Sequence, residues 1–185
     1  MMQTVTSLYA QRLKEHHAST KWGVTVATKI SHIDIFAEEN NVRSILDYGC
    51  GQGILKEKLG HKYEITEYDA GISGKDILPS EVYDMIVCVD VAEHFEPDTV
   101  ASNFKAMHDR VAKCVYMTIS CEPAIGCFAD GTNLHLTIKP PWEWMQIIDA
   151  EFQPKKLNFY GTDRGLLVKL QCGSKADGNV QSCVD

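Results

Sequence analysis

Along this chain, short apolar runs typical of strands alternate with segments whose apolar residues recur with helical spacing. This order predicts strands separated by helices. Short runs rich in β-branched and aliphatic residues predict strands at 43–48, 63–68, 84–89, 115–119, 157–160 and 166–170. Between them, apolar residues recur at intervals of three and four, as in the helical stripe of Val100, Phe104 and Met107. The run at 84–89 is apolar throughout, which is typical of a strand covered on both faces of a sheet.

Strands that alternate with helices predict an α/β fold, here a Rossmann-like, doubly wound and mostly parallel sheet. We expect seven strands, six of them parallel, with an antiparallel strand at 165–171 that forms a C-terminal hairpin. The hairpin follows because no helix-length segment separates the last two strands. We expect a single domain at 1–172 that includes a helical segment at 1–40, followed by a disordered polar tail at 173–185.

The most informative segment is residues 44–53, which read Ser-Ile-Leu-Asp-Tyr-Gly-Cys-Gly-Gln-Gly and precede a helix-forming run. A strand, a glycine turn and a helix in this order form the nucleotide cleft of open α/β sheets. The glycine spacing does not fit a dinucleotide fingerprint, whose third glycine would stand at Ile54, and a P-loop would need a lysine and a hydroxyl. The acid Asp47 suits a ligand with an adenosine, positive charge and no phosphate, such as S-adenosylmethionine (SAM).

The second half of this cleft is predicted where the second strand ends. Asp69 stands 20 residues after Gly49, a separation at which a carboxylate can bind the two ribose hydroxyls. Farther on, Asp76 can accept a hydrogen bond from an adenine amino group, and Ile77 can cover the ring. The predicted cofactor-binding residues are therefore Asp47, Gly49, Cys50, Gly51, Asp69, Ala70, Asp76, Ile77 and Asp90.

The chain resembles the class I SAM-dependent methyltransferases. The resemblance is carried by three segments, residues 47–53, 68–72 and 83–94. In the last of them an acid precedes the pair Glu93 and His94, and the loop at 130–136 is similar to one in small bacterial and phage methyltransferases of unassigned substrate. The resemblance covers about residues 42–152. It implies SAM as the methyl donor and S-adenosylhomocysteine (SAH) as the product, and it says almost nothing about the acceptor.

The candidate catalytic residues follow the predicted strands. Methyl transfer from a sulfonium is an in-line displacement, for which an enzyme mainly supplies alignment, and a general base helps only when the acceptor must lose a proton. We expect Glu93 and His94 at the mouth of the cofactor pocket, with His135 approaching from an opposite loop. The alternative for His94 is a structural role at a helix end.

Charge and composition limit the acceptor and the location. The net charge of −7 argues against non-specific nucleic-acid binding, and we expect a small-molecule or carbohydrate acceptor that is methylated on nitrogen or oxygen. No apolar run is long enough to cross a membrane and the N-terminus lacks an apolar signal region, so we expect a cytoplasmic protein. Seven cysteines without a CxxC pair predict reduced thiols and no metal, although Cys121, Cys127 and His135 could be assembled into a site.

Other readings compete with methyl transfer to a small acceptor. The segment from Lys139 to Trp142, Lys-Pro-Pro-Trp, imitates a motif of DNA amino-methyltransferases, but lysine cannot accept the hydrogen bond which that motif requires. Trp142 and Trp144 either wall a substrate pocket or belong to the core. Because the chain is short and has no evident substrate domain, it can also be a SAM-cleaving lyase or hydrolase, or a non-catalytic SAM-binding subunit.

Overall fold

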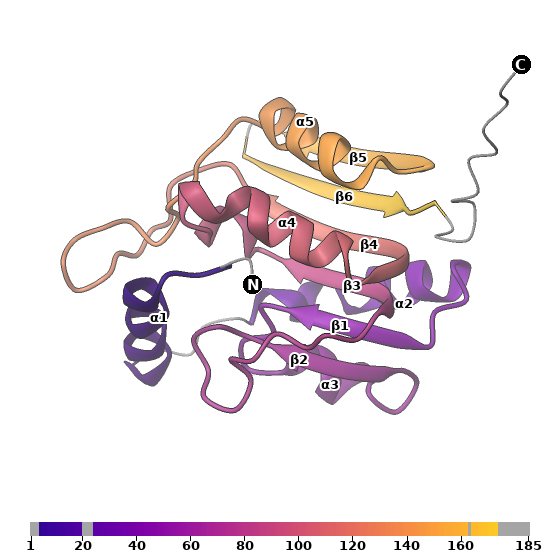
Figure 1. Cartoon of the computed structure of the whole chain (residues 1–185), viewed down its shortest axis with the longest axis horizontal. Helices are drawn as coiled ribbons and strands as arrows, with labels where there is room; N and C mark the ends of the chain where they lie inside the picture. The colour runs from indigo at the N-terminus through magenta and orange to yellow at the C-terminus, as the bar shows by residue number, and fades with distance from the viewer. Residues whose placement is uncertain (1–3, 20–23, 163, 174–185) are drawn as a thin grey trace, which may run out of the picture.

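The computed structural model describes residues 4–19, 24–162 and 164–173, and it contains a single mixed sheet (Figure 1). The strands of this sheet are β1 (Ser44–Tyr48), β2 (Glu64–Tyr68), β3 (Tyr83–Val89), β4 (Val111–Ser120), β5 (Lys156–Thr162) and β6 (Gly165–Gln171). Their order is β2-β1-β3-β4-β6-β5. The chain runs from β1 to β2 on one side and then returns to β3 on the other side of β1, which creates a topological switch point between β1 and β3.

The Rossmann-like α/β fold and the antiparallel C-terminal hairpin are confirmed, but the prediction of seven strands, six of them parallel, is wrong. The described residues form six strands, and five of them run in one direction, because β6 is antiparallel to both β4 and β5. The long segment between β4 and the next helix contributes only an isolated bridge between Cys127 and Asn133. Its alternating apolar run of Leu134, Leu136 and Ile138 does not form a strand in the structure. The predicted tail lies outside the described residues from position 174 onward.

Helices cover both faces of the sheet. The α-helices are α1 (Ser7–Ser19), α2 (Ile30–Glu39), α3 (Ile54–Leu59), α4 (Val100–His108) and α5 (Pro141–Phe152), and the short 3-10 helices are η1 (Thr25–Thr28), η2 (Ala92–His94) and η3 (Pro97–Thr99). Buried residues of α2 and α3 pack on one face, and those of α4 and α5 pack on the other. No helix in the described part of the chain is sufficiently long and apolar to span a bilayer.

Two apolar cores follow from the period of two along the strands. Neighbours in a strand point to opposite faces of a sheet. Ile45 accordingly joins the core under α2 and α3, whereas Leu46 joins the core under α4 and α5. The same alternation separates Val87 from Cys88 in β3, and all four side chains are fully buried. Both faces of β3 are therefore covered, as its continuous apolar run predicts.

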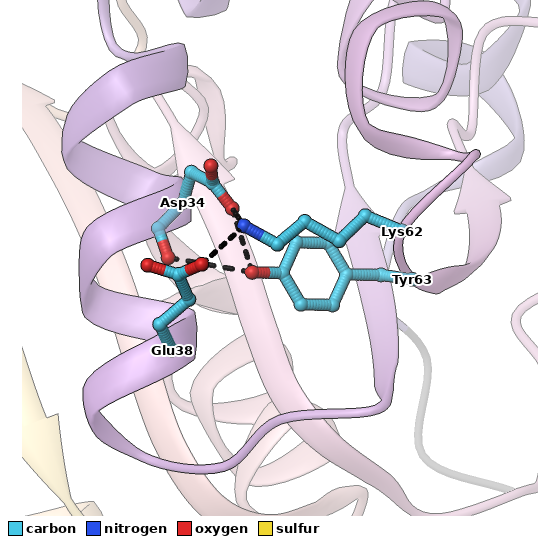
Figure 2. Close-up of polar contacts among 4 residues, drawn as sticks. All are labelled: Asp34, Glu38, Lys62 and Tyr63. Carbon is cyan, nitrogen blue, oxygen red and sulfur yellow. Dashed lines mark hydrogen bonds and ion pairs between the residues drawn. The ribbon is translucent and has the colours of Figure 1, made fainter.

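A polar cluster fastens α2 to the turn that precedes β2 (Figure 2). The Lys62 ammonium donates to Asp34 Oδ1 at 2.7 Å and to Glu38 Oε1 at 2.5 Å. The Tyr63 hydroxyl also donates to Asp34 Oδ1, at 2.6 Å. Asp34 and Glu38 are four residues apart and hence on the same face of α2, so one lysine can reach both. The cluster therefore links α2 to the start of β2, which is an edge strand of the sheet.

Helix α1 lies beyond the carboxyl ends of the central strands (Figure 1). Its start is capped by Thr6, whose Oγ1 accepts the backbone N–H of Tyr9 at 3.2 Å. The Thr6 hydroxyl and backbone N–H donate in turn to the Glu96 carboxylate, at 2.7 and 2.8 Å. The Tyr9 hydroxyl donates to the His94 carbonyl at 2.7 Å. These contacts fix α1 over the end of the sheet where a ligand is expected.

Candidate active site

A cavity of about 290 Å³ opens at the switch point between β1 and β3. Residues at the ends of β1 and β3 line it together with α1, η2 and the loop after β4. The side chains and backbone groups relevant to a ligand are Tyr9, Leu13, His17, Asp47, Gly49, Cys50, Gly51, Asp69, Ala70, Asp90, Glu93, His94, Leu134 and His135.

The glycine turn after β1 forms the floor of the cavity. Gly49 has a φ of 81°, in the region that favours glycine, and a Cβ there would lie 2.4 Å from Val91 Cγ2. The backbone N–H groups of Gly49 and Cys50 both donate to the Tyr68 carbonyl, at 2.8 and 3.0 Å. These bonds attach the turn to the end of β2, so the backbone passes closely under whatever occupies the cavity.

Asp47, at the end of β1, is a buried acid, and one of its carboxylate oxygens lacks a hydrogen-bond partner among the described residues. It is 4% exposed, and its Oδ2 has no hydrogen-bond partner among the residues that the structure describes. Burial, and to a smaller extent the carboxylates of Glu67 and Asp69, raise the pKa of Asp47 to about 8. A buried carboxylate of this kind is stabilised by a cation, and Asp47 lines the cavity where a cationic ligand could supply one.

Asp69, just after β2, is held in a fixed orientation by backbone groups. Its Oδ2 accepts the N–H of Gly51 and its Oδ1 accepts the N–H of Gly71, both at 2.9 Å. Burial opposes ionisation of Asp69, but the hydrogen bonds from His17, Gly71 and Gly51 outweigh it and hold the pKa below its usual value. A carboxylate oxygen has two lone pairs, so Asp69 retains capacity to accept from ligand hydroxyls.

Seven of the nine predicted cofactor residues line this cavity, and two lie outside it. Asp76 instead accepts from the Lys14 ammonium of α1 at 2.9 Å and from the Gly74 N–H at 3.2 Å. Ile77 is 85% exposed, so the structure does not bring it onto a ligand in the cavity. Asp90 does line the cavity, and its carboxylate accepts from the Thr118 hydroxyl at 2.6 Å.

Glu93 also lines the cavity, from η2 immediately after β3. It is fully buried, and its Oε1 accepts the Ser120 backbone N–H at 3.0 Å. Its Oε2 has no hydrogen-bond partner within the described ranges. Burial and then the carboxylate of Asp90 raise the pKa of Glu93 to about 8.

His94 and His135 meet at the cavity and form one cluster with Glu93. Their ring centroids are 4.8 Å apart and the rings are nearly perpendicular. Nδ1 of His94 lies 2.8 Å from the Leu134 carbonyl, and Nδ1 of His135 lies 2.5 Å from the Glu122 carbonyl. A carbonyl only accepts, so each Nδ1 carries a proton that it donates to its carbonyl. Burial lowers the pKa of His94 to about 4, which keeps its imidazole neutral at pH 7.

Sequence reasoning missed the contribution of α1. Tyr9, Leu13 and His17 recur at intervals of four and all line the cavity. Tyr9 and Leu13 also pack in a small core with Phe128 and Leu134. The spacing of these residues indicates that α1 has one buried face. The sequence does not indicate that this face covers the carboxyl ends of the strands.

Three other candidates do not take part in the cavity. Trp142 is 60% exposed and Trp144 is fully buried in the core beneath α4 and α5, so neither tryptophan walls the site. Lys139 also lies elsewhere. Among the described residues, Cys121 and Cys127 do not assemble with His135 into a group of potential metal ligands.

Comparisons with known proteins agree with this geometry. The model of a methyltransferase domain family matches residues 16–153. The N-methyltransferase NodS from Bradyrhizobium japonicum, solved with SAH, has a TM-score of 0.60 at 16% identity, covering 90% of this chain and 99% of that one. The magnesium protoporphyrin IX methyltransferase of Synechocystis, solved with SAM, has a TM-score of 0.62 at 12% identity, covering 89% and 97%.

A third similar structure is the 1,6-didemethyltoxoflavin N1-methyltransferase of Burkholderia thailandensis, solved with its substrate and SAH. Its TM-score is 0.61 at 15% identity, and the match covers 92% of this chain and 91% of that one. No curated protein matches the sequence. At these identities the solved structures establish the fold, whereas the family model matches most of the sequence itself. The chain therefore belongs to the methyltransferase domain family, and its assignment to the class I SAM-dependent methyltransferases is confirmed.

Proposed function

We propose that this protein transfers the methyl group of SAM to a nitrogen or oxygen atom of a small molecule or sugar held in the cavity between β1 and β3. One observation carries the proposal. A single cavity joins the acids at the ends of β1 and β2, Asp47 and Asp69, to the cluster of Glu93, His94 and His135. The two acids suit the methyl donor SAM, and the cluster suits a methyl acceptor.

The donor end has features that fit SAM. The buried Oδ2 of Asp47 lacks a partner, and SAM carries an ammonium that can provide one. Asp69 is preoriented by the N–H groups of Gly51 and Gly71, and it can accept from the ribose hydroxyls. Gly49, Cys50 and Gly51 of the turn after β1 also line the cavity, so a ligand there can contact the turn. Asp76 and Ile77 lie outside the cavity and are not part of this proposal.

The acceptor end is suited to bind and orient a nucleophilic atom. Bound SAM supplies an electrophilic methyl group on a sulfonium. The side chains of Glu93, His94 and His135 orient the acceptor and promote the loss of its proton, while Tyr9 and Leu134 exclude water. The proposal of a small acceptor is supported by the small molecule bound in the didemethyltoxoflavin enzyme.

Product analysis tests this function. The protein is incubated with SAM that carries an isotope-labelled methyl group, together with fractionated pools of metabolites and sugars. We expect SAH to form in step with label in one acceptor fraction, and at least tenfold less of both products with Asp69→Ala at a SAM concentration below saturation. Formation of methylthioadenosine or homoserine lactone without a labelled acceptor would show a SAM-cleaving enzyme instead. If no pool supports turnover although SAM binds, the chain is a SAM-binding subunit.

A further inference from the structure

We infer that Glu93, His94 and His135 form a binding site for a divalent transition-metal cation at the acceptor end of the cavity. Each residue offers one ligand atom, and the three atoms lie within 4.8 Å of one another. Two of the residues come from η2 and the third from the loop after β4, so the fold brings together ligands that are 41 and 42 residues apart. The role given to this cation rests on the proposed function, whereas its binding does not.

The spacing of the three ligand atoms suits one ion after small movements. Imidazole nitrogens and carboxylate oxygens bind zinc-like ions at about 2.0–2.2 Å, which places neighbouring ligands roughly 3–4 Å apart. The ligand atoms, now within 4.8 Å of one another, would have to approach to that range on binding. His135 is held by a loop rather than by a helix or strand, so it is the ligand with most freedom to adjust.

Both imidazoles are already oriented as metal ligands usually are. A histidine that binds a metal almost always donates its other ring N–H to a carbonyl or carboxylate, which fixes the tautomer. His94 donates from Nδ1 to the Leu134 carbonyl, and His135 donates from Nδ1 to the Glu122 carbonyl. Nε2 is therefore the nitrogen that each ring can offer to a cation. Two independent carbonyl contacts produce the same tautomer in adjacent histidines.

Glu93 supplies a separate observation that points to a cation. One of its oxygens is held by the Ser120 N–H, while the other lacks a hydrogen-bond partner in the described part of the chain. The side chain is fully buried and lines the cavity. A buried carboxylate oxygen without a partner is costly, and a bound cation removes that cost.

The ligand set selects the class of metal. Two imidazoles and one carboxylate favour Zn²⁺, Co²⁺ or Fe²⁺, whereas Mg²⁺ and Ca²⁺ prefer sites made of oxygen ligands. Three protein ligands also leave a coordination position open.

An acceptor hydroxyl in that open position would have its pKa lowered by the cation and would release its proton to solvent. Its oxygen would then bond to the methyl carbon, and the electron pair of the broken C–S bond would pass to sulfur and give neutral SAH.

A metal titration tests the site without SAM or an acceptor. A Cys127→Ser background removes an exposed thiol as a competing ligand. This protein is titrated with Co²⁺ and Zn²⁺ by calorimetry, and Co²⁺ is also followed by visible absorption. We expect one ion per chain, at least tenfold weaker binding in Glu93→Gln and His135→Ala, and no competition from millimolar Mg²⁺. His32→Ala, which changes an exposed histidine on α2, is the matched control and should bind like the parent.

Each outcome of this titration decides the question. Equal affinity in the parent and in His135→Ala, or no saturable binding by the parent, overturns the metal site. His135→Ala serves as the test if Glu93→Gln fails to fold, since His135 lies in a surface loop. Metal binding without methyl transfer would leave the site intact and refute the proposed function. Methyl transfer that is unaffected by chelation, in a protein that binds no metal, would refute the site alone.

Discussion

His17 of α1 lies against Asp69, with 3.5 Å between Nε2 of the histidine and Oδ1 of the acid. The N-terminal helix thus reaches the carboxylate that we assign to the ribose. The same helix contacts the acceptor end through the bond from the Tyr9 hydroxyl to the His94 carbonyl. Helix α1 therefore bridges the two halves of the cavity. Any ligand that binds Asp69 must share this acid with His17 or displace the imidazole.

The buried acid at Asp47 predicts a pH-dependent stability. Its pKa is raised to about 8 in the folded protein, against about 3.9 in an unfolded chain. The contribution of this carboxyl to stability is therefore complete below about pH 4 and is lost as the pH rises through 8. Asp47→Asn stays neutral, so without SAM its melting temperature should gain on the wild type between pH 5 and 9. Parallel curves would show that Asp47 ionises at its ordinary pKa.

The same substitution should weaken SAM binding. Asparagine keeps the shape of Asp47 but cannot carry the charge that we pair with the ammonium of SAM. Hydrogen bonds to charged groups contribute about 1.5–3 kcal/mol, so calorimetry should show at least a tenfold loss of SAM affinity. Gain of stability together with loss of affinity would mark Asp47 as a residue kept for binding.

Asp34 predicts a stability change of the opposite sign at low pH. Hydrogen bonds from Lys62 and Tyr63 lower the pKa of Asp34 in the folded protein. Asp34 therefore stabilises the fold at a pH above its pKa in the unfolded chain, and this stabilisation is lost as the pH falls through its pKa in the folded protein. Asp34→Asn should cost roughly 1 kcal/mol at pH 7 and progressively less toward pH 3. Urea denaturation at both pH values measures the difference. Glu38→Gln is the control, because Glu38 is more exposed and contacts only Lys62 in this cluster (Figure 2).

The acceptor cluster predicts variants that bind SAM but turn over slowly. Promotion of proton loss typically contributes 10²–10⁴-fold, and Glu93→Gln and His94→Ala should lower the rate on an oxygen acceptor by a factor in that range. SAM affinity should stay near the wild-type value, because Asp47 and Asp69 are unchanged. Normal methylation by both variants would place the acceptor elsewhere, in the loop at 128–135. Calorimetry and circular dichroism on each variant distinguish a lost fold from lost chemistry.

The sequence predicts those features of the structure that are determined by residues close together in the chain. The alternation of Ile45 and Leu46, the glycine at position 49 and the acid at the end of β2 each express a local rule. Glu93 and His94 could be placed because ligands lie beyond the carboxyl ends of parallel strands, and they do line the cavity with His135.

The features that could not be predicted depend on tertiary packing. Nothing local says that the face of α1 with Tyr9 and His17 covers the cavity, since a helix with that stripe could pack on any apolar surface. Asp76 is an acid in the loop where a contact to adenine was expected, but it pairs with Lys14 of α1 and lies outside the cavity. The expectation of seven strands had no seventh segment behind it, because the sequence pattern marks six strand-like runs and the described residues form six strands.

The central claim is that SAM binds in the cavity between β1 and β3 with its ribose on Asp69, and calorimetric titration of SAH into three proteins tests it most directly. The wild type should bind one SAH per chain. Asp69→Ala should bind at least tenfold more weakly, because it loses two charge-assisted hydrogen bonds of about 1.5–3 kcal/mol each. Asp76→Ala, which alters an acid outside the cavity, should bind like the wild type. Unchanged affinity in a folded Asp69→Ala protein, or a loss confined to Asp76→Ala, would contradict the claim.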